Sequence, residues 1–324
     1  MYINFMIWEN KNIYIANWLL LITFLVGLII IVGGLTRLTD SGLSITEWEL
    51  FTGTIPPLSV NQWNEYFDLY KKIPEYKLQN YSMTLEEFKV IFWWEFIHRF
   101  LGRLIGIFFL LPLIFFTIKL GFKATIHFHL IFILICLQGF IGWYMVSSGL
   151  VNRIDVSHYR LALHLGLAFI IFSITLWNYL GYKNIKLPNL KIYFLLPLIF
   201  IFLLFSQIIV GAFVSGMDAG KIYNTWPLMG INYFPDDNSY FNLFSWSALN
   251  EPSLVQFIHR NLAYLILLFY LFIFYEVYRK KLTNYFRVLY VVGFFLILQI
   301  VLGIFTLLTG AQIFLSSVHQ ISSI

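Results

Sequence analysis

The residues with the greatest potential for chemistry belong to a five-residue motif that occurs twice in the chain. It reads Glu-Phe-Ile-His-Arg at residues 95–99 and Gln-Phe-Ile-His-Arg at residues 256–260. Each copy opens a long apolar run, and an ionisable residue inside a membrane segment is costly enough to indicate a functional site. Because the copies differ only in Glu95 against Gln256, Glu95 is a candidate proton acceptor or charge stabiliser. The alternative is a structural ion pair between Glu95 and Arg99.

Four histidines share a similar depth near the outer ends of four different apolar runs: His98, His164, His259 and His319. A four-helix bundle that places histidines on two facing helices at one level can hold a haem iron through the ring nitrogens. Two such pairs, His98 with His164 and His259 with His319, predict two haem sites.

Arginines follow these histidines or flank the outer surface: Arg37, Arg99, Arg103, Arg160 and Arg260. Arginine pairs bidentately with carboxylates, so these residues are candidates for contacts with haem propionates. The alternative role is a plain interfacial anchor. The remaining histidines, His127, His129 and His158, are interpreted as interfacial polar residues.

The composition places the chain in a membrane. Of its 324 residues, 60% are hydrophobic and 11% are charged, whereas soluble proteins contain about 25% charged residues. The formal net charge of +5 does not indicate nucleic-acid binding, because the basic residues lie mostly in short loops. A single cysteine, Cys136, excludes an intrachain disulfide and a thiolate metal cluster.

Apolar runs of about 20 residues predict the membrane spans. They lie near residues 17–36, 92–118, 124–146, 160–181, 192–214, 254–278 and 285–309, and an eighth begins near 312. Backbone groups find no partners in lipid, so these runs must be helices. The prediction is an all-α polytopic membrane protein with eight transmembrane helices. The last helix is truncated at Ile324 and too short to cross.

The chain also contains an internal repeat. Val32, Gly33, Asp40, Gly42, Trp48 and Pro57 match Val210, Gly211, Asp218, Gly220, Trp226 and Pro235 at a constant offset of 178 residues. Glu95, His98, Arg99, Gln138, Gly142 and Gly149 match Gln256, His259, Arg260, Gln299, Gly303 and Gly310 at an offset of 161. Four spans per repeat give both copies the same orientation. We therefore expect two tandem four-helix bundles, residues 1–182 and 183–324.

Basic residues in the short loops predict the orientation. Lys119, Lys123, Arg279, Lys280 and Arg287 fall on one side, which is expected to be the cytoplasm. The amino terminus is then cytoplasmic, and the long loop 37–91 lies outside. An amphipathic pattern around Trp63, Phe67 and Tyr70 indicates that this loop forms an ordered cap on the membrane surface.

Several long motifs resemble one family. They are residues 33–42, 53–58, 95–106, 138–151, 159–166, 211–230 and 256–264, and together they resemble haem A synthase of the alphaproteobacterial and mitochondrial type. The resemblance implies an enzyme that oxidises a methyl group of haem o to an aldehyde through an alcohol. The product is haem A for cytochrome oxidase.

The resemblance also implies roles for individual residues. His98 and His164 hold the iron of the substrate haem, His259 and His319 hold a haem b cofactor that relays electrons, and Glu95 matches the catalytic acidic residue. The implied location is the bacterial cell inner membrane, or the mitochondrial inner membrane in an organelle. Haem o synthase and cytochrome oxidase assembly factors are candidate partners, while the electron donor and a homo-oligomer are left open.

Two other classes of protein remain as alternatives. A di-haem electron carrier of the membrane cytochrome b kind would also use histidine pairs, but it would not require Glu95 in one half and Gln256 in the other. A transporter also often contains parallel repeats. It would require broken helices and charged residues at mid-membrane, and the sequence indicates neither.

Overall fold

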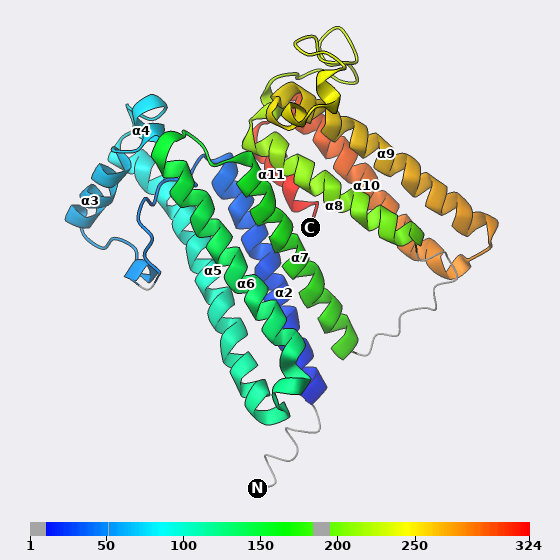
Figure 1. Ribbon diagram of the computed structural model, residues 1–324, viewed down its shortest axis with the longest axis horizontal. Coiled ribbons are helices and arrows are strands. Elements are labelled where there is room, and N and C mark those ends of the chain that lie inside the picture. Colours follow the sequence, from blue (N-terminus) through cyan, green and yellow to red (C-terminus); the bar gives the residue numbers. More distant parts are fainter. Residues whose placement is uncertain (1–10, 51, 184–194) are drawn as a thin grey trace. The chain divides into compact units, whose positions relative to one another are not determined.

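The structure, a computed structural model, describes residues 11–50, 52–183 and 195–324. In these residues the regular structure is helical, and the only β pairing is an isolated bridge between Met229 and Asn232. Seven helices are long and apolar enough to cross a membrane (Figure 1). They are α2 (Lys11–Leu38), α5 (Leu85–Leu120), α6 (Phe122–Asn152), α7 (His158–Tyr182), α8 (Leu195–Gly216), α9 (Pro252–Arg279) and α10 (Phe286–Leu308). The expectation of an all-helical membrane protein is confirmed.

The eighth predicted span is represented by a short helix. Helix α11 (Ile313–Ile321) has nine residues, so at 1.5 Å per residue it is about 14 Å long and does not cross a hydrocarbon core of about 30 Å. The described residues thus contain seven candidate spans, and eight are not confirmed. The predicted span 192–214 begins outside the described residues, and α8 is described from Leu195.

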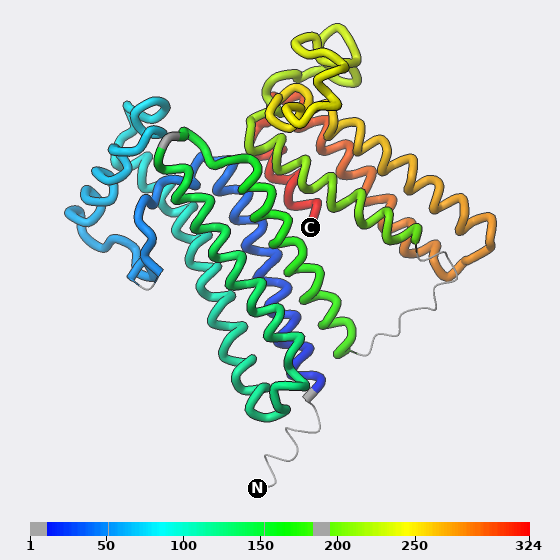
Figure 2. Tube along the Cα trace, in the orientation of Figure 1, coloured from blue at the N-terminus to red at the C-terminus, as the bar shows by residue number. Residues whose placement is uncertain are grey.

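The chain divides into two compact units, Met1–Leu187 and Pro188–Ile324. In the first unit, α2 packs against α5 and α7, and α6 packs against the same two helices. Helices α5 and α7 are therefore opposite corners of a four-helix arrangement, which Figure 2 shows from blue to green. Side chains at one level of these two helices can face each other.

The second unit contains α8, α9, α10 and α11. Its helices pack in chain order, with α8 against α9, α9 against α10, and α10 against α11. The predicted internal repeat is visible in its backbone as well as in its sequence. Asp218, two residues after α8, has a φ of 50°, and the matching Asp40 after α2 has a φ of 49°. Aspartate is one of the few residues that adopt this left-handed conformation readily.

The long loop after α2 is ordered and contains short helices, and its place on the membrane surface stays a prediction; we call it the cap. Its main helix, α3 (Val60–Tyr70), begins at a capping box in which Ser59 and Gln62 satisfy each other's backbone amides. The predicted amphipathic residues lie on α3 and pack on α5. The ring centroids of Trp63 and Phe92 are 4.9 Å apart, and those of Phe67 and Phe88 are 5.0 Å apart.

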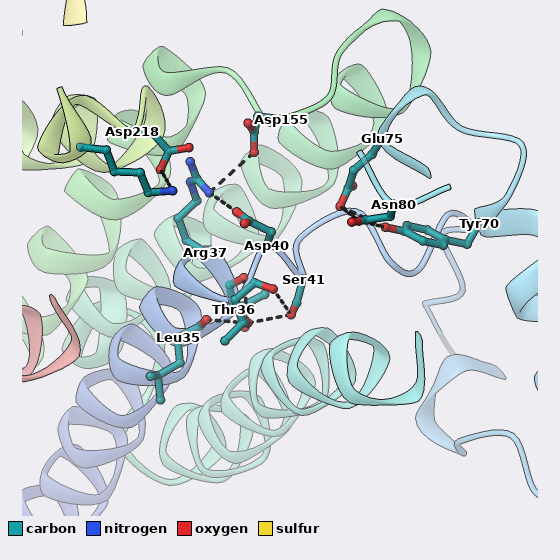
Figure 3. Close-up of polar contacts among 12 residues, drawn as sticks. Leu35, Thr36, Arg37, Asp40, Ser41, Tyr70, Glu75, Asn80, Asp155 and Asp218 are labelled. Atoms are coloured by element: carbon teal, nitrogen blue, oxygen red, sulfur yellow. Dashed lines mark hydrogen bonds and ion pairs between the residues drawn. The ribbon is translucent and has the colours of Figure 1, made fainter. Parts of the chain in front are cut away.

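A buried carboxyl lies inside this cap. Glu75 on α4 (Pro74–Leu78) is 3% exposed. Its Oε1 accepts hydrogen bonds from the Tyr70 hydroxyl at 3.1 Å and from the Asn80 amide at 3.4 Å (Figure 3), while its Oε2 is buried without a partner. Burial, with smaller contributions from Asp155 and other carboxylates, raises the pKa of Glu75 to about 8.

We expect this carboxyl to make the stability of the cap depend on pH. The folded state holds the Glu75 proton more tightly than the unfolded state, so the resulting stability is complete below the ordinary pKa. It declines as the pH rises to about 8. Thermal unfolding and limited proteolysis of the cap across this range should show the decline, and Glu75→Gln should remove it.

Glu86→Gln is the matched control, because Glu86 is exposed and paired with Lys89. This variant should keep the pH dependence of the wild-type protein. An equal pH dependence in Glu75→Gln and the wild-type protein would show that Glu75 is not the titrating group.

Candidate functional site

The first pair of predicted histidines faces across the first unit. His98 lies on α5 and His164 on α7, and their ring centroids are 6.3 Å apart with ring planes at 64°. A metal–nitrogen bond of histidine is about 2.0 to 2.1 Å long, so rings on opposite sides of one metal ion have centroids about 6 Å apart. The separation of the two rings is therefore suitable for holding one iron atom between them.

Each of these rings packs directly against a glycine of the neighbouring helix. A Cβ atom added at Gly33 of α2 would lie 2.8 Å from Cε1 of His98, and one added at Gly142 of α6 would lie 3.0 Å from Cε1 of His164. Only glycine leaves enough space for such a close approach. Small residues at helix contacts let membrane helices pack closely, and here they make room for the histidine rings.

The second unit repeats this arrangement. A Cβ atom at Gly211 of α8 would lie 3.2 Å from Cε1 of His259, and one at Gly303 of α10 would lie 3.1 Å from Cε1 of His319. All four predicted histidines therefore share one packing environment, with two of them in each unit.

Several ring nitrogens are left without a hydrogen-bond partner in the protein. Nδ1 of His98, His259 and His319 is buried and forms no hydrogen bond within the described residues. Burying such a group is costly unless it gains a partner. Imidazole is a common axial ligand of haem iron, so these residues fit the predicted haem sites.

Glu95 is fully buried and fully hydrogen-bonded. Its Oε1 accepts from Nε and Nη2 of Arg99 at 3.0 and 2.6 Å. Its Oε2 accepts from the Ser44 hydroxyl and the Ile45 amide, both at 2.7 Å. The structure thus contains the ion pair with Arg99 that was the alternative role for Glu95, and a catalytic role stays a prediction.

The matching position in the second unit forms a different bond. Gln256 donates from Nε2 to the Tyr223 carbonyl at 3.1 Å, whereas Glu95 accepts from the backbone amide of Ile45. Tyr223 and Ile45 are themselves equivalent in the repeat. The hydrogen bond to this loop position therefore runs in opposite directions in the two units. Glu95 accepts it from Ile45, and Gln256 donates it to Tyr223.

Two of the candidate arginines hold the loops that follow α2 and α8. Arg99 donates to the carbonyls of Ile45 and Glu47, and Arg260 donates to those of Tyr223 and Thr225. These acceptors match at the offset of 178 residues. Arg99 therefore anchors the loop after α2 next to His98, and Arg260 anchors the loop after α8 next to His259.

The other three arginines have separate contacts. Arg103 donates to the carbonyls of Glu49 and Leu50, and its Nη1 is buried without a partner. Arg37 pairs with Asp40 at 2.7 Å and with Asp155 at 3.6 Å, as Figure 3 shows. Arg160 lies over the ring of Tyr144 at 4.5 Å.

Comparison with known proteins identifies the family. Residues 16–324 match the COX15-CtaA family, described as cytochrome oxidase assembly protein. The chain belongs to this family. It is 51% identical to a protein named heme A synthase from Pelagibacter ubique, with 98% of this chain and 94% of that protein covered. A protein of the same name from Parvibaculum lavamentivorans is 48% identical, with 78% of this chain and 75% of that protein covered. Another from Rickettsia bellii is 42% identical, with 97% of this chain and 95% of that protein covered.

The family resemblance predicted from the sequence is therefore confirmed.

The histidines interpreted as polar residues at the membrane interface have ordinary partners. Nδ1 of His129 lies 3.0 Å from the Thr125 carbonyl, and Nε2 of His127 lies 3.3 Å from the Tyr182 hydroxyl. His158 is the first residue of α7 and is buried.

Sequence reasoning missed two contributors to the site. Ser44 binds the Glu95 carboxylate across 51 residues of chain, and nothing in its spacing indicates this contact. Gln207 was not singled out, although it stands four residues before Gly211 as Gln138 stands before Gly142. This recurring spacing is the signal that could have identified it.

We expect Gly33→Ala to displace the His98 ring, because the new methyl group would occupy the space of Cε1. Haem titration of the purified protein should show at least about a tenfold loss of affinity at the first site, as for other changes that disturb the support of a metal ligand. Gly102→Ala on α5 is the control, since its Cβ would meet only Ile29 at 3.6 Å. Equal haem affinity in Gly33→Ala and Gly102→Ala would contradict the packing argument.

Proposed function

We propose that this chain is a haem A synthase, a membrane oxidoreductase that converts a methyl group of haem o into an aldehyde through an alcohol. The observation that carries the proposal is similarity over almost the full length to relatives named heme A synthase. The four histidines with their glycine partners support it, because they offer one iron-binding pair in each unit.

In this proposal the two pairs have different tasks. His98 and His164 bind the iron of the substrate haem o, for which their ring separation of 6.3 Å is suitable. His259 and His319 hold a haem b cofactor. When bound, haem b would supply electron transfer. The protein's contribution is to hold each ring against its glycine, so that the iron ligands are already positioned when haem binds.

Glu95 is proposed to act as a fixed negative charge near the substrate. Oxidation of a methyl group leaves an electron-poor carbon, and a carboxylate held in place can stabilise that charge without reorganising. The bonds from Arg99, Ser44 and Ile45 hold Glu95 in place. Since each oxygen already accepts two hydrogen bonds, this role suits the geometry better than taking up a proton.

The propionates of the haems are proposed to contact arginine. The best supported candidate is Arg103, because its Nη1 is buried and still available as a donor. Arg260 has an unpartnered Nε in the second unit. Arg37, Arg99 and Arg160 remain candidates of the same kind.

The apolar helices and the bacterial relatives support a membrane setting for the chain. We place the protein in the cell inner membrane with a cytoplasmic amino terminus, as the basic loops indicate. Haem o is its substrate, and haem o synthase and cytochrome oxidase assembly factors are proposed partners.

The function is tested in bacterial cells that make haem o but have no haem A synthase of their own. Cells that produce this chain should contain haem A when their haems are extracted and separated by chromatography. Cells without the chain should contain none. Haem b bound to the purified protein without any haem A in the cells would instead support the di-haem electron carrier.

Glu95→Gln should stop the oxidation and leave haem binding intact. The amide has the shape of the carboxylate, and Gln256 occupies the matching position of the second unit, but an amide carries no charge to stabilise the reacting carbon. The purified variant should contain haem b and accumulate haem o or the alcohol, with little haem A.

Ser44→Ala is the matched control, because it removes one hydrogen bond from Glu95 and keeps the charge. It should lower stability by about 1 kcal/mol and still produce haem A. Normal haem A levels in Glu95→Gln would limit Glu95 to its structural pairing with Arg99.

The orientation is tested by labelling single cysteines in a Cys136→Ser background. Asn64→Cys in the cap and Ser239→Cys in the loop before α9 are exposed positions, and both should react with an impermeant thiol reagent added to intact spheroplasts. Lys123→Cys, at the start of α6, should react only after the membrane is broken. The reverse pattern would place the haem sites at the cytoplasmic face.

A further inference from the structure

Three glutamines occupy equivalent places beside the histidines. Gln138 on α6, Gln207 on α8 and Gln299 on α10 each stand four residues before the glycine that packs against a histidine ring. Residues four apart lie on the same face of a helix. Each glutamine is therefore one turn away from a histidine ring, on the helix next to it.

Each of these glutamines bonds to the main chain of its histidine. The Nε2 groups of Gln138, Gln207 and Gln299 donate to the carbonyls of His164, His259 and His319 at 2.9, 3.1 and 3.0 Å. In two cases the same amide also approaches the ring, at 3.2 Å from Nδ1 of His164 and 3.3 Å from Nε2 of His259. One side chain thus connects two helices at the level of the predicted iron ligand.

The fourth histidine has no such support. The position on α2 that matches Gln207 is Ile29, four residues before Gly33. The His98 ring hydrogen-bonds to the main chain of Ile29, and no side-chain amide among the described residues reaches it. His98 is therefore the only one of the four that is held by packing without a glutamine.

Burying these glutamine side chains costs free energy, and packing alone does not explain why glutamine occupies these positions. Oε1 of Gln138 and of Gln207 is buried without a hydrogen-bond partner. An apolar residue of similar size would avoid burying this oxygen. Ile29 shows that the fold accepts an apolar residue at the equivalent position, so the amides are not required by the packing itself.

We propose that Gln138, Gln207 and Gln299 are positioning residues for the iron ligands, and that Ile29 leaves His98 as the exchangeable ligand. This inference rests on the proposed function. An enzyme that modifies one haem with the help of another must release the first and retain the second. Contacts from outside the ligand shell hold a ligand in place. Three of the four histidines are held by a glutamine and His98 is not, so the substrate site contains the ligand that is displaced most easily.

The experiment measures haem loss from the purified full-length protein to an excess of globin that has been stripped of its own haem. Wild-type protein should lose haem in two phases, with the faster phase from the first unit. Ile29→Gln should slow the fast phase about tenfold, and Gln207→Leu and Gln299→Leu should accelerate the slow phase by a similar factor. Ile29→Leu, which adds no amide, is the matched control and should change neither phase.

Absorption spectra distinguish an effect on the position of the histidine ligand from an effect on the folding of the protein. Low-spin absorption spectra should be retained in Ile29→Gln, which shows that the slower loss comes from the same pair of ligands. Unchanged rates in Ile29→Gln, Gln207→Leu and Gln299→Leu, with haem bound as in the wild-type protein, would overturn this inference and leave the proposed function intact. Absence of haem from the wild-type protein would overturn both.

Discussion

The close packing of a histidine ring against a glycine of the neighbouring helix is the constraint on which the rest of the structure depends. It occurs at Gly33, Gly142, Gly211 and Gly303, where an added Cβ would lie 2.8 to 3.2 Å from the ring. A side chain at any of these positions would push the ring or the helix aside. In the proposed haem sites, the spacing of the helix pairs at this level would also determine where the iron atom lies.

The two units share this frame and differ in the polar residues around it. Arg99 and Arg260 hold equivalent loop carbonyls, so the duplication extends to hydrogen bonds. The first unit alone combines a buried carboxylate, Glu95, with an apolar residue, Ile29, where the second unit has Gln207. In the proposed account, these two exchanges give the first unit a fixed carboxylate and a histidine without a glutamine, which suits a site where a substrate reacts and leaves.

Much of this organisation could be predicted from the sequence, because apolar length and exact repeat offsets are properties of the chain itself. The predicted boundaries of the helices were less accurate than the prediction that the helices exist. Helix α5 begins at Leu85, seven residues before the apolar run predicted at 92, because the capping box of Thr84 and Glu87 extends it beyond the hydrophobic segment. The bond from Ser44 to Glu95 depends on the path of a loop, which periodicity does not specify. The burial of Glu75 is another consequence of that path.

The central claim is that each unit binds its own haem through its own pair of histidines, and haem content after removal of single ligands tests it most directly. His98→Ala and His259→Ala should each lose one haem and keep the spectrum of the other, because the two pairs lie in separate compact units. His127→Ala, whose ring lies near Tyr182, should keep both. Loss of both haems from either ligand variant, or retention of both, would contradict the account.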